Sequence, residues 1–81
     1  MRTIQKFSLE IKPMQDIHGP IDRIIYVGLD CKGQPCIYAE VDTSDVSYGA
    51  TVFLIRAGEP IPRNGLYKGT ILMHNAWHVY M

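Results

Sequence analysis

The sequence predicts a mostly β protein, in which a small antiparallel sheet of five to six strands curls into a partial barrel or sandwich. Apolar and polar residues alternate in several short segments, which is the period of a half-buried strand. Glycine, proline and asparagine separate these segments at short intervals. The longest candidate helix, residues 14–21, contains a Gly-Pro pair that a helix interior does not tolerate.

The chain begins with an alternating segment. In residues 2–11, Phe7, Leu9 and Ile11 face one way and polar side chains face the other. A proline ends this predicted strand. Residues 13–20 are predicted to be a loop, because a Gly-Pro pair closes them.

The middle of the chain predicts a β-hairpin. Residues 22–30 are rich in β-branched side chains, residues 36–42 alternate, and a Lys-Gly turn joins the two segments. Tyr26 and Tyr38 fall on the side opposite the predicted core. The predicted core positions are Ile25, Val27 and Leu29 in the first strand and Ile37, Ala39 and Val41 in the second.

The last third of the chain predicts one strand and a second hairpin. After a polar turn at residues 43–49, residues 50–56 are apolar on both faces, so the strand is either covered on both sides or part of an interface. Residues 70–73 and 76–81 are predicted to pair across a turn at His74-Asn75, where asparagine supplies a positive φ.

The bulk composition narrows the class of function. The chain has 81 residues, enough for a single β-rich domain over residues 1–81. Eight basic residues balance eight acidic ones, so no nucleic acid is expected as a partner. The N-terminus lacks a signal-peptide pattern, no apolar run is long enough to cross a membrane, and only two cysteines are present. These features predict a soluble cytoplasmic protein.

Few residues point to catalysis or metal binding. Cys31 and Cys36 flank the turn of the middle hairpin, where a redox pair or half of a metal site is conceivable. Two free thiols, one packed and one on a turn, are the simpler interpretation. His18, His74 and His78 lack nearby acidic or cysteine partners, so no metal site is expected. Serines and carboxylates are scattered, and neither an enzyme nor a cofactor is expected.

A polar, proline-containing loop is the candidate contact region. Within residues 56–70, Pro60 and Pro62 stiffen the chain, Gly65 suits a positive φ, and Gly69 suits a close approach to a neighbouring strand. The segment is either a braced connector or a pre-ordered binding loop. Arginine and tyrosine are favoured in interfaces and also suit phosphates and nucleobases. The candidate binding residues are Arg56, Glu59, Arg63, Tyr67 and Lys68.

Several motifs together resemble a family of small uncharacterised bacteriophage and prophage proteins, a domain of unknown function. They are "IQKFSLEI", "PCIYAEVD", "GEPIP", "YKGT" and the terminal "WHVYM", and the resemblance covers nearly the whole chain. The family supplies no catalytic residues. The resemblance implies a phage accessory protein that acts by binding, in many cases as a homo-oligomer.

These observations lead to one leading expectation and two alternatives. We expect a non-catalytic accessory protein that counters a bacterial defence system by contacting a host protein in the bacterial cytoplasm. The first alternative is a sponge that sequesters a phosphorylated signalling nucleotide at an oligomer interface. The second is a structural or assembly component of a phage.

Overall fold

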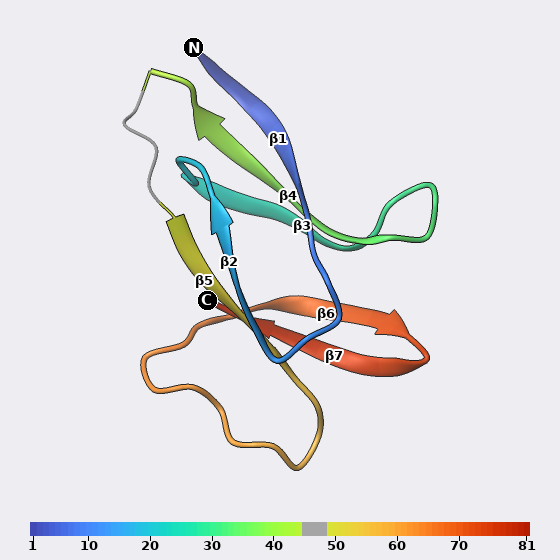
Figure 1. Cartoon of the computed structure of the whole chain (residues 1–81). Helices are drawn as coiled ribbons and strands as arrows, with labels where there is room; N and C mark the ends of the chain where they lie inside the picture. Colours follow the sequence, from blue (N-terminus) through green and yellow to red (C-terminus); the bar gives the residue numbers. More distant parts are fainter. Residues whose placement is uncertain (45–48) are drawn as a thin grey trace.

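Seven β-strands form two antiparallel sheets in the computed structural model, which describes residues 1–44 and 49–81 (Figure 1). The first sheet has the strand order β1-β4-β3 and the second β2-β5-β7-β6. The described residues contain no helix, so the mostly β expectation is confirmed, with more strands than predicted and two sheets in place of one. The strands are β1 (Arg2–Ser8), β2 (Met14–His18), β3 (Arg23–Leu29), β4 (Pro35–Asp42), β5 (Gly49–Ile55), β6 (Tyr67–Met73) and β7 (Asn75–Tyr80).

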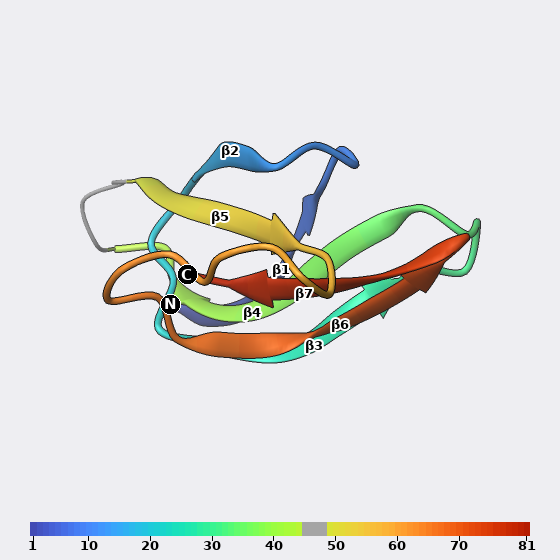
Figure 2. The same ribbon diagram turned by 90° about the horizontal axis from the view of Figure 1, so that it is seen from below.

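The two sheets approach each other most closely where β3 and β6 lie side by side (Figure 2). Gly69 makes this approach possible, because a Cβ atom at that position would lie 2.8 Å from the Cβ of Val27. The predicted role of Gly69 is therefore confirmed. The sheets nevertheless remain separate hydrogen-bonded ladders, and they do not form a closed barrel.

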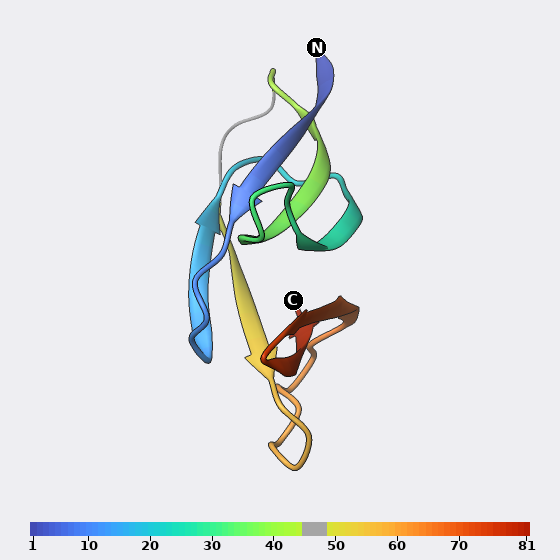
Figure 3. The ribbon, with the colours of Figure 1, turned by 90° about the vertical axis from the view of Figure 1, so that its right-hand side faces the viewer.

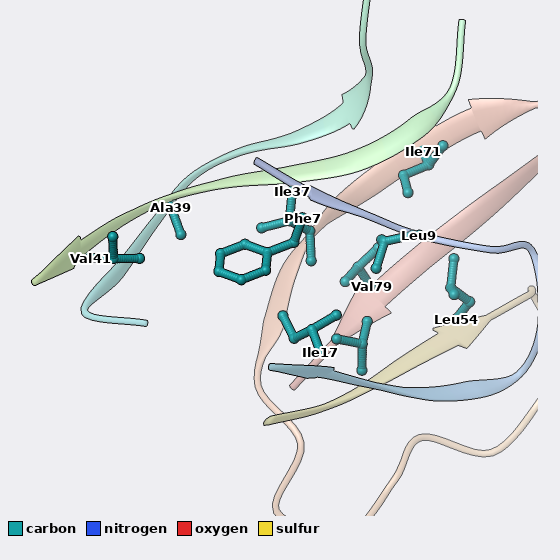
Figure 4. Close-up of a cluster of buried hydrophobic side chains, with 10 residues drawn as sticks. Phe7, Leu9, Ile17, Ile37, Ala39, Val41, Leu54, Ile71 and Val79 are labelled. Carbon is teal, nitrogen blue, oxygen red and sulfur yellow. The ribbon is translucent and has the colours of Figure 1, made fainter. Parts of the chain in front are cut away.

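The core lies between the sheets, and β4 contributes its centre (Figures 3 and 4). Ile37, Ala39 and Val41 are completely buried, as their alternation with polar residues predicted. A fully buried side chain of the size of Ile37 or Val41 contributes roughly 1.5–3 kcal/mol to stability. Facing them across the core, the second sheet contributes Ile17, Val52, Leu54, Ile71 and Val79.

The prediction of a loop over residues 13–20 is wrong, because Met14–His18 forms strand β2 and pairs with β5. The strand is short and buries only Ile17, whose side chain is 5% exposed. Its hydrogen-bonding partner lies more than thirty residues further along the chain, where Ala50 faces Ile17. Nothing in the local pattern of residues could reveal such a distant pairing.

Two predicted core positions are exposed. β1 ends at Ser8, and Ile11 is 38% exposed although Leu9 is buried. In β3, a bulge shifts the register between Ile24 and Tyr26. As a result Ile24 packs against the core, and Ile25, which was predicted to do so, is 40% exposed.

The C-terminal hairpin is confirmed, with different turn residues and a longer first strand. β6 begins at Tyr67, so the predicted loop ends earlier than residue 70. The positive φ of the hairpin turn belongs to His74 (63°) and not to the asparagine that follows. In the preceding loop Asn64 (63°), and not Gly65, takes the positive φ. A polar turn was predicted at residues 43–49, and residues 45–48 of this segment lie outside the described residues.

Asp30 organises the turn between β3 and β4. Its carboxylate accepts hydrogen bonds from the backbone N–H of Gln34 (3.0 Å) and Lys32 (2.8 Å), and from Nζ of Lys6 (3.0 Å). These donors, led by Gln34, favour the charged form and lower the pKa of Asp30 to about 2.

Asp42 closes the opposite end of the same sheet. Its Oδ1 accepts hydrogen bonds from the Ser44 hydroxyl (2.6 Å), the Ser44 N–H (3.0 Å) and the Met1 ammonium group (3.2 Å). These donors, led by the Ser44 hydroxyl, lower the pKa of Asp42 to about 2.

The stability of the protein is expected to fall as the pH drops from about 4 towards about 2. Both carboxyl groups have folded-state pKa values below the unfolded value of 3.8, so their contribution is fully present above that pH and is lost on protonation. Melting temperature measured against pH should show a weaker acid dependence in Asp30→Asn than in the unmodified protein. Asp16→Asn, which removes a carboxylate and keeps an oxygen that can accept the hydrogen bond from Thr51, is the control and should retain the full acid dependence.

Candidate functional site

The outer faces of the two sheets differ in character. On the three-stranded sheet, Glu40 forms ion pairs with Arg2 (3.0 Å) and Arg23 (3.1 Å). The rings of Tyr26 and Tyr38 lie 5.9 Å apart beside these charges, on the side opposite the core as predicted. This face therefore combines paired charges with the exposed side chains of Ile4 and Tyr26.

A row of four large side chains crosses the outer face of the four-stranded sheet. The strand register places Met14 beside Phe53, Phe53 beside Tyr80, and Tyr80 beside Tyr67. These side chains point away from the core, because their neighbours along β5 and β7 are buried on the inner face. We call Met14, Phe53, Tyr80 and Tyr67 the outer row.

Contacts within the sheet hold one end of the outer row in place. The rings of Tyr67 and Tyr80 meet edge to face, with centroids 5.7 Å apart. The Tyr67 hydroxyl hydrogen-bonds to Oγ1 of Thr70 (2.6 Å), which in turn hydrogen-bonds to Nδ1 of His78 (3.0 Å). Tyr67 is 57% exposed in spite of these contacts, so its ring is ordered and accessible.

The apolar character of this face extends beyond the outer row. Leu72 on β6 is 72% exposed, and Ile61 in the loop over residues 56–66 is 62% exposed. Ile61, Ile55 and Tyr80 are among the residues that line a depression of about 210 Å³. Among the described residues, no ion pair joins side chains of the four strands in this sheet.

Two of the predicted binding residues form a turn of their own at the rim of this face. The backbone N–H of Arg56 donates to Oε1 of Glu59 (2.7 Å), and Nε of Arg56 lies 3.8 Å from the same oxygen. The guanidinium carbon of Arg56 lies 5.5 Å from the ring centroid of Trp77. Arg56 and Glu59 therefore brace the loop as well as bordering the outer face.

The other three predicted binding residues divide into two groups. Tyr67 and Lys68 open β6, whereas Arg63 lies in an exposed turn. Within the part of the chain that is described, no hydrogen bond or ion pair joins Arg63 to the other four residues. The sequence did not identify Met14, Phe53 and Tyr80, although the two apolar faces of β5 indicated that one of them could lie in an interface.

A second concave feature, the inter-sheet cleft, lies between the ends of the two sheets. It has a volume of about 510 Å³. Ile24 at the start of β3, Ala50 on β5, Tyr67 and Lys68 on β6, and the terminal Met81 all line it. Two of the predicted binding residues therefore belong to this cleft.

The cysteines are both free, as interpreted from the sequence. Cys31 is exposed on its turn, and Cys36 is buried, which raises the pKa of its thiol. Over residues 1–44 and 49–81, no three histidine, cysteine or acidic side chains are placed to hold a metal ion. In the same ranges there is no helix long and apolar enough to cross a membrane.

These features define a small β protein whose two outer faces differ, since one carries paired charges and the other the outer row. The chain belongs to the family described as domain of unknown function DUF7352, whose model matches residues 1–81. The expected membership of an uncharacterised domain family is thereby confirmed. Comparisons with curated proteins and with solved structures found no match.

Proposed function

We propose that this protein acts by non-catalytic binding of another protein, and that the outer row is the centre of the contact surface. The observation that supports this function is the alignment of Met14, Phe53, Tyr80 and Tyr67 across one open sheet face. Aromatic side chains dominate the binding energy of protein interfaces. A sheet holds them rigidly, so little conformational entropy is lost on binding.

We also propose that the protein associates with itself. The formal net charge is zero, so copies do not repel one another over long range. The outer row carries no charge, and its exposed apolar area would be covered in a dimer. The three-stranded sheet is less suited to this role, because its charges are already paired on its outer face.

A narrower proposal is that the protein is a bacteriophage or prophage accessory protein that counters a bacterial defence system. Its support is the resemblance of motifs such as "GEPIP" and "WHVYM" to phage-encoded proteins. In this proposal the partner is a bacterial protein in the host cytoplasm. Arg56, Glu59 and Arg63, in the loop that borders the outer row, would contact the polar rim of that partner.

An aspartate substitution at the exposed end of the outer row, Met14→Asp, should weaken binding at least about tenfold. Ile4→Asp is the matched control, because Ile4 is 58% exposed on the other sheet and Met14 is 61% exposed. Self-association is measured by light scattering, and partner binding by recovery from bacterial lysate on the immobilised protein. Surface substitutions of this kind change stability by only about 0.5 kcal/mol, so melting temperatures should stay close together.

Two results would contradict the proposal. One is a monomeric protein that retains no lysate protein, and the other is an equal loss of binding in Ile4→Asp. Arg63→Glu tests the contribution of the loop separately, since intact folding and binding in that variant would make the loop a connector only. Recovery with assembled phage particles would favour the structural alternative.

A further inference from the structure

We infer that the inter-sheet cleft binds a small organic anion that has an apolar body, and that Lys68 holds the anionic group. This site is separate from the protein contact proposed for the outer row. The cleft opens between the sheets, whereas the outer row lies on the outside of one of them. Tyr67 takes part in both features, so it is not a useful position for testing either one alone.

The size and walls of the cleft suit a small molecule. Its volume of about 510 Å³ falls within the range of roughly 300–1,000 Å³ that is usual for small-ligand sites. Ile21, Ile24, Ala50 and Met81 supply apolar walls on several sides. Such walls favour a ligand with an apolar or aromatic ring, because its transfer from water is then favourable.

One positive side chain at the cleft has no ion-pair partner among the described residues. Of the three charged side chains that line the cleft, two are paired, Arg23 with Glu40 at 3.1 Å and Asp22 with Arg2 at 3.7 Å. Lys68, the third, forms no ion pair with any residue in the described ranges. Its ammonium group is therefore available for a charge-assisted hydrogen bond to a carboxylate or phosphate.

The cleft changes the form of the nucleotide alternative. From the sequence, a phosphorylated nucleotide was expected at a subunit boundary, held by arginine, lysine and tyrosine. The cleft places Lys68 and Tyr67 together within a single chain, with no second copy required. A nucleoside monophosphate and an aromatic carboxylate share the chemistry that this site recognises, so both belong in the test.

Amide NMR spectra recorded during titration with 2-naphthyl phosphate, 2-naphthoate and adenosine monophosphate test this inference. The amide signals of Gly19, Ile24 and Gly49, which line the cleft, should shift with at least one of these probes. Neutral 2-naphthol should bind about tenfold more weakly, because it cannot pair with Lys68. Comparison of the affinities for 2-naphthyl phosphate and 2-naphthoate shows whether a phosphate or a carboxylate is preferred.

Lys68→Gln should weaken binding of the preferred anion about tenfold, whereas Arg63→Gln, which removes an exposed positive charge elsewhere, should not. Met14→Asp should also leave binding unchanged, which separates this inference from the outer-row proposal. The inference is overturned if no probe shifts the cleft signals, or if the shifts are confined to the outer row. Equal effects of Lys68→Gln and Arg63→Gln, or equal affinity for 2-naphthol, would overturn the role of Lys68.

Discussion

Replacement of Ile37 by alanine is expected to lower the free energy of unfolding by about 2–5 kcal/mol. Ile37 is completely buried at the centre of β4, where its side chain faces the second sheet (Figure 4). A domain of 81 residues has a total stability of only about 4–12 kcal/mol. The substitution should therefore unfold a substantial fraction of the molecules on mild heating. Chemical denaturation followed by circular dichroism measures the change.

Leu72→Ala is the control for this prediction, because it also shortens a large aliphatic side chain within a strand. Leu72 is 72% exposed on the outer face of β6, so its removal leaves no cavity. The expected change in unfolding free energy is within about 0.5 kcal/mol. Similar losses in the two variants would mean that the core does not lie between the two sheets as described.

The sequence predicted the middle of the fold well, because the interactions there are local. β3 and β4 pair across a short turn, and the alternation in β4 marks its buried side without reference to any other segment. A β-bulge cannot be predicted from this alternation, because its extra residue exchanges the inward-facing and outward-facing positions of the residues before it in the strand. For this reason Ile25 was placed in the core and Ile24 was not.

The candidate site could be predicted only in part, because the outer row is a product of strand register. Met14, Phe53 and Tyr80 are far apart in the sequence and become neighbours only when β2, β5 and β7 pair. Composition instead drew attention to the loop over residues 56–66, where charged residues and prolines are concentrated. The structure places this loop beside the apolar face.

The contrast between the two outer faces also bears on how the protein avoids unwanted pairing. β1 is an edge strand, and its outward-facing Arg2 and Lys6 are both held in ion pairs. Charged side chains on an edge strand discourage the addition of a further strand. This arrangement agrees with the proposal that the outer row, and not the open edge of β1, is the contact surface.

Gly69→Ala is expected to lower the free energy of unfolding by about 1–3 kcal/mol, because the new methyl group would overlap Val27 where β3 and β6 meet. The φ angle of 157° at Gly69 is also one that residues with a Cβ atom rarely adopt, so alanine would strain the backbone there. Lys68 adjoins Gly69, so a displaced β6 should also weaken anion binding in the inter-sheet cleft. Unfolding by denaturant and the naphthyl probe titration measure the two effects.

Val27→Ala provides a partial matching test, since it removes the two methyl groups that would lie 3.2 and 3.3 Å from the new methyl group and leaves the Cβ of residue 27 in place. On its own, Val27→Ala should cost about 1–2 kcal/mol of stability, because Val27 packs against the core. In the double variant, Gly69→Ala should cost about 1 kcal/mol less than it does alone, and the remainder reflects backbone strain and the retained Cβ of residue 27, which Val27→Ala cannot relieve. Strictly additive losses would show that the methyl groups of Val27 do not limit the space at Gly69, contrary to the packing described where β3 and β6 meet.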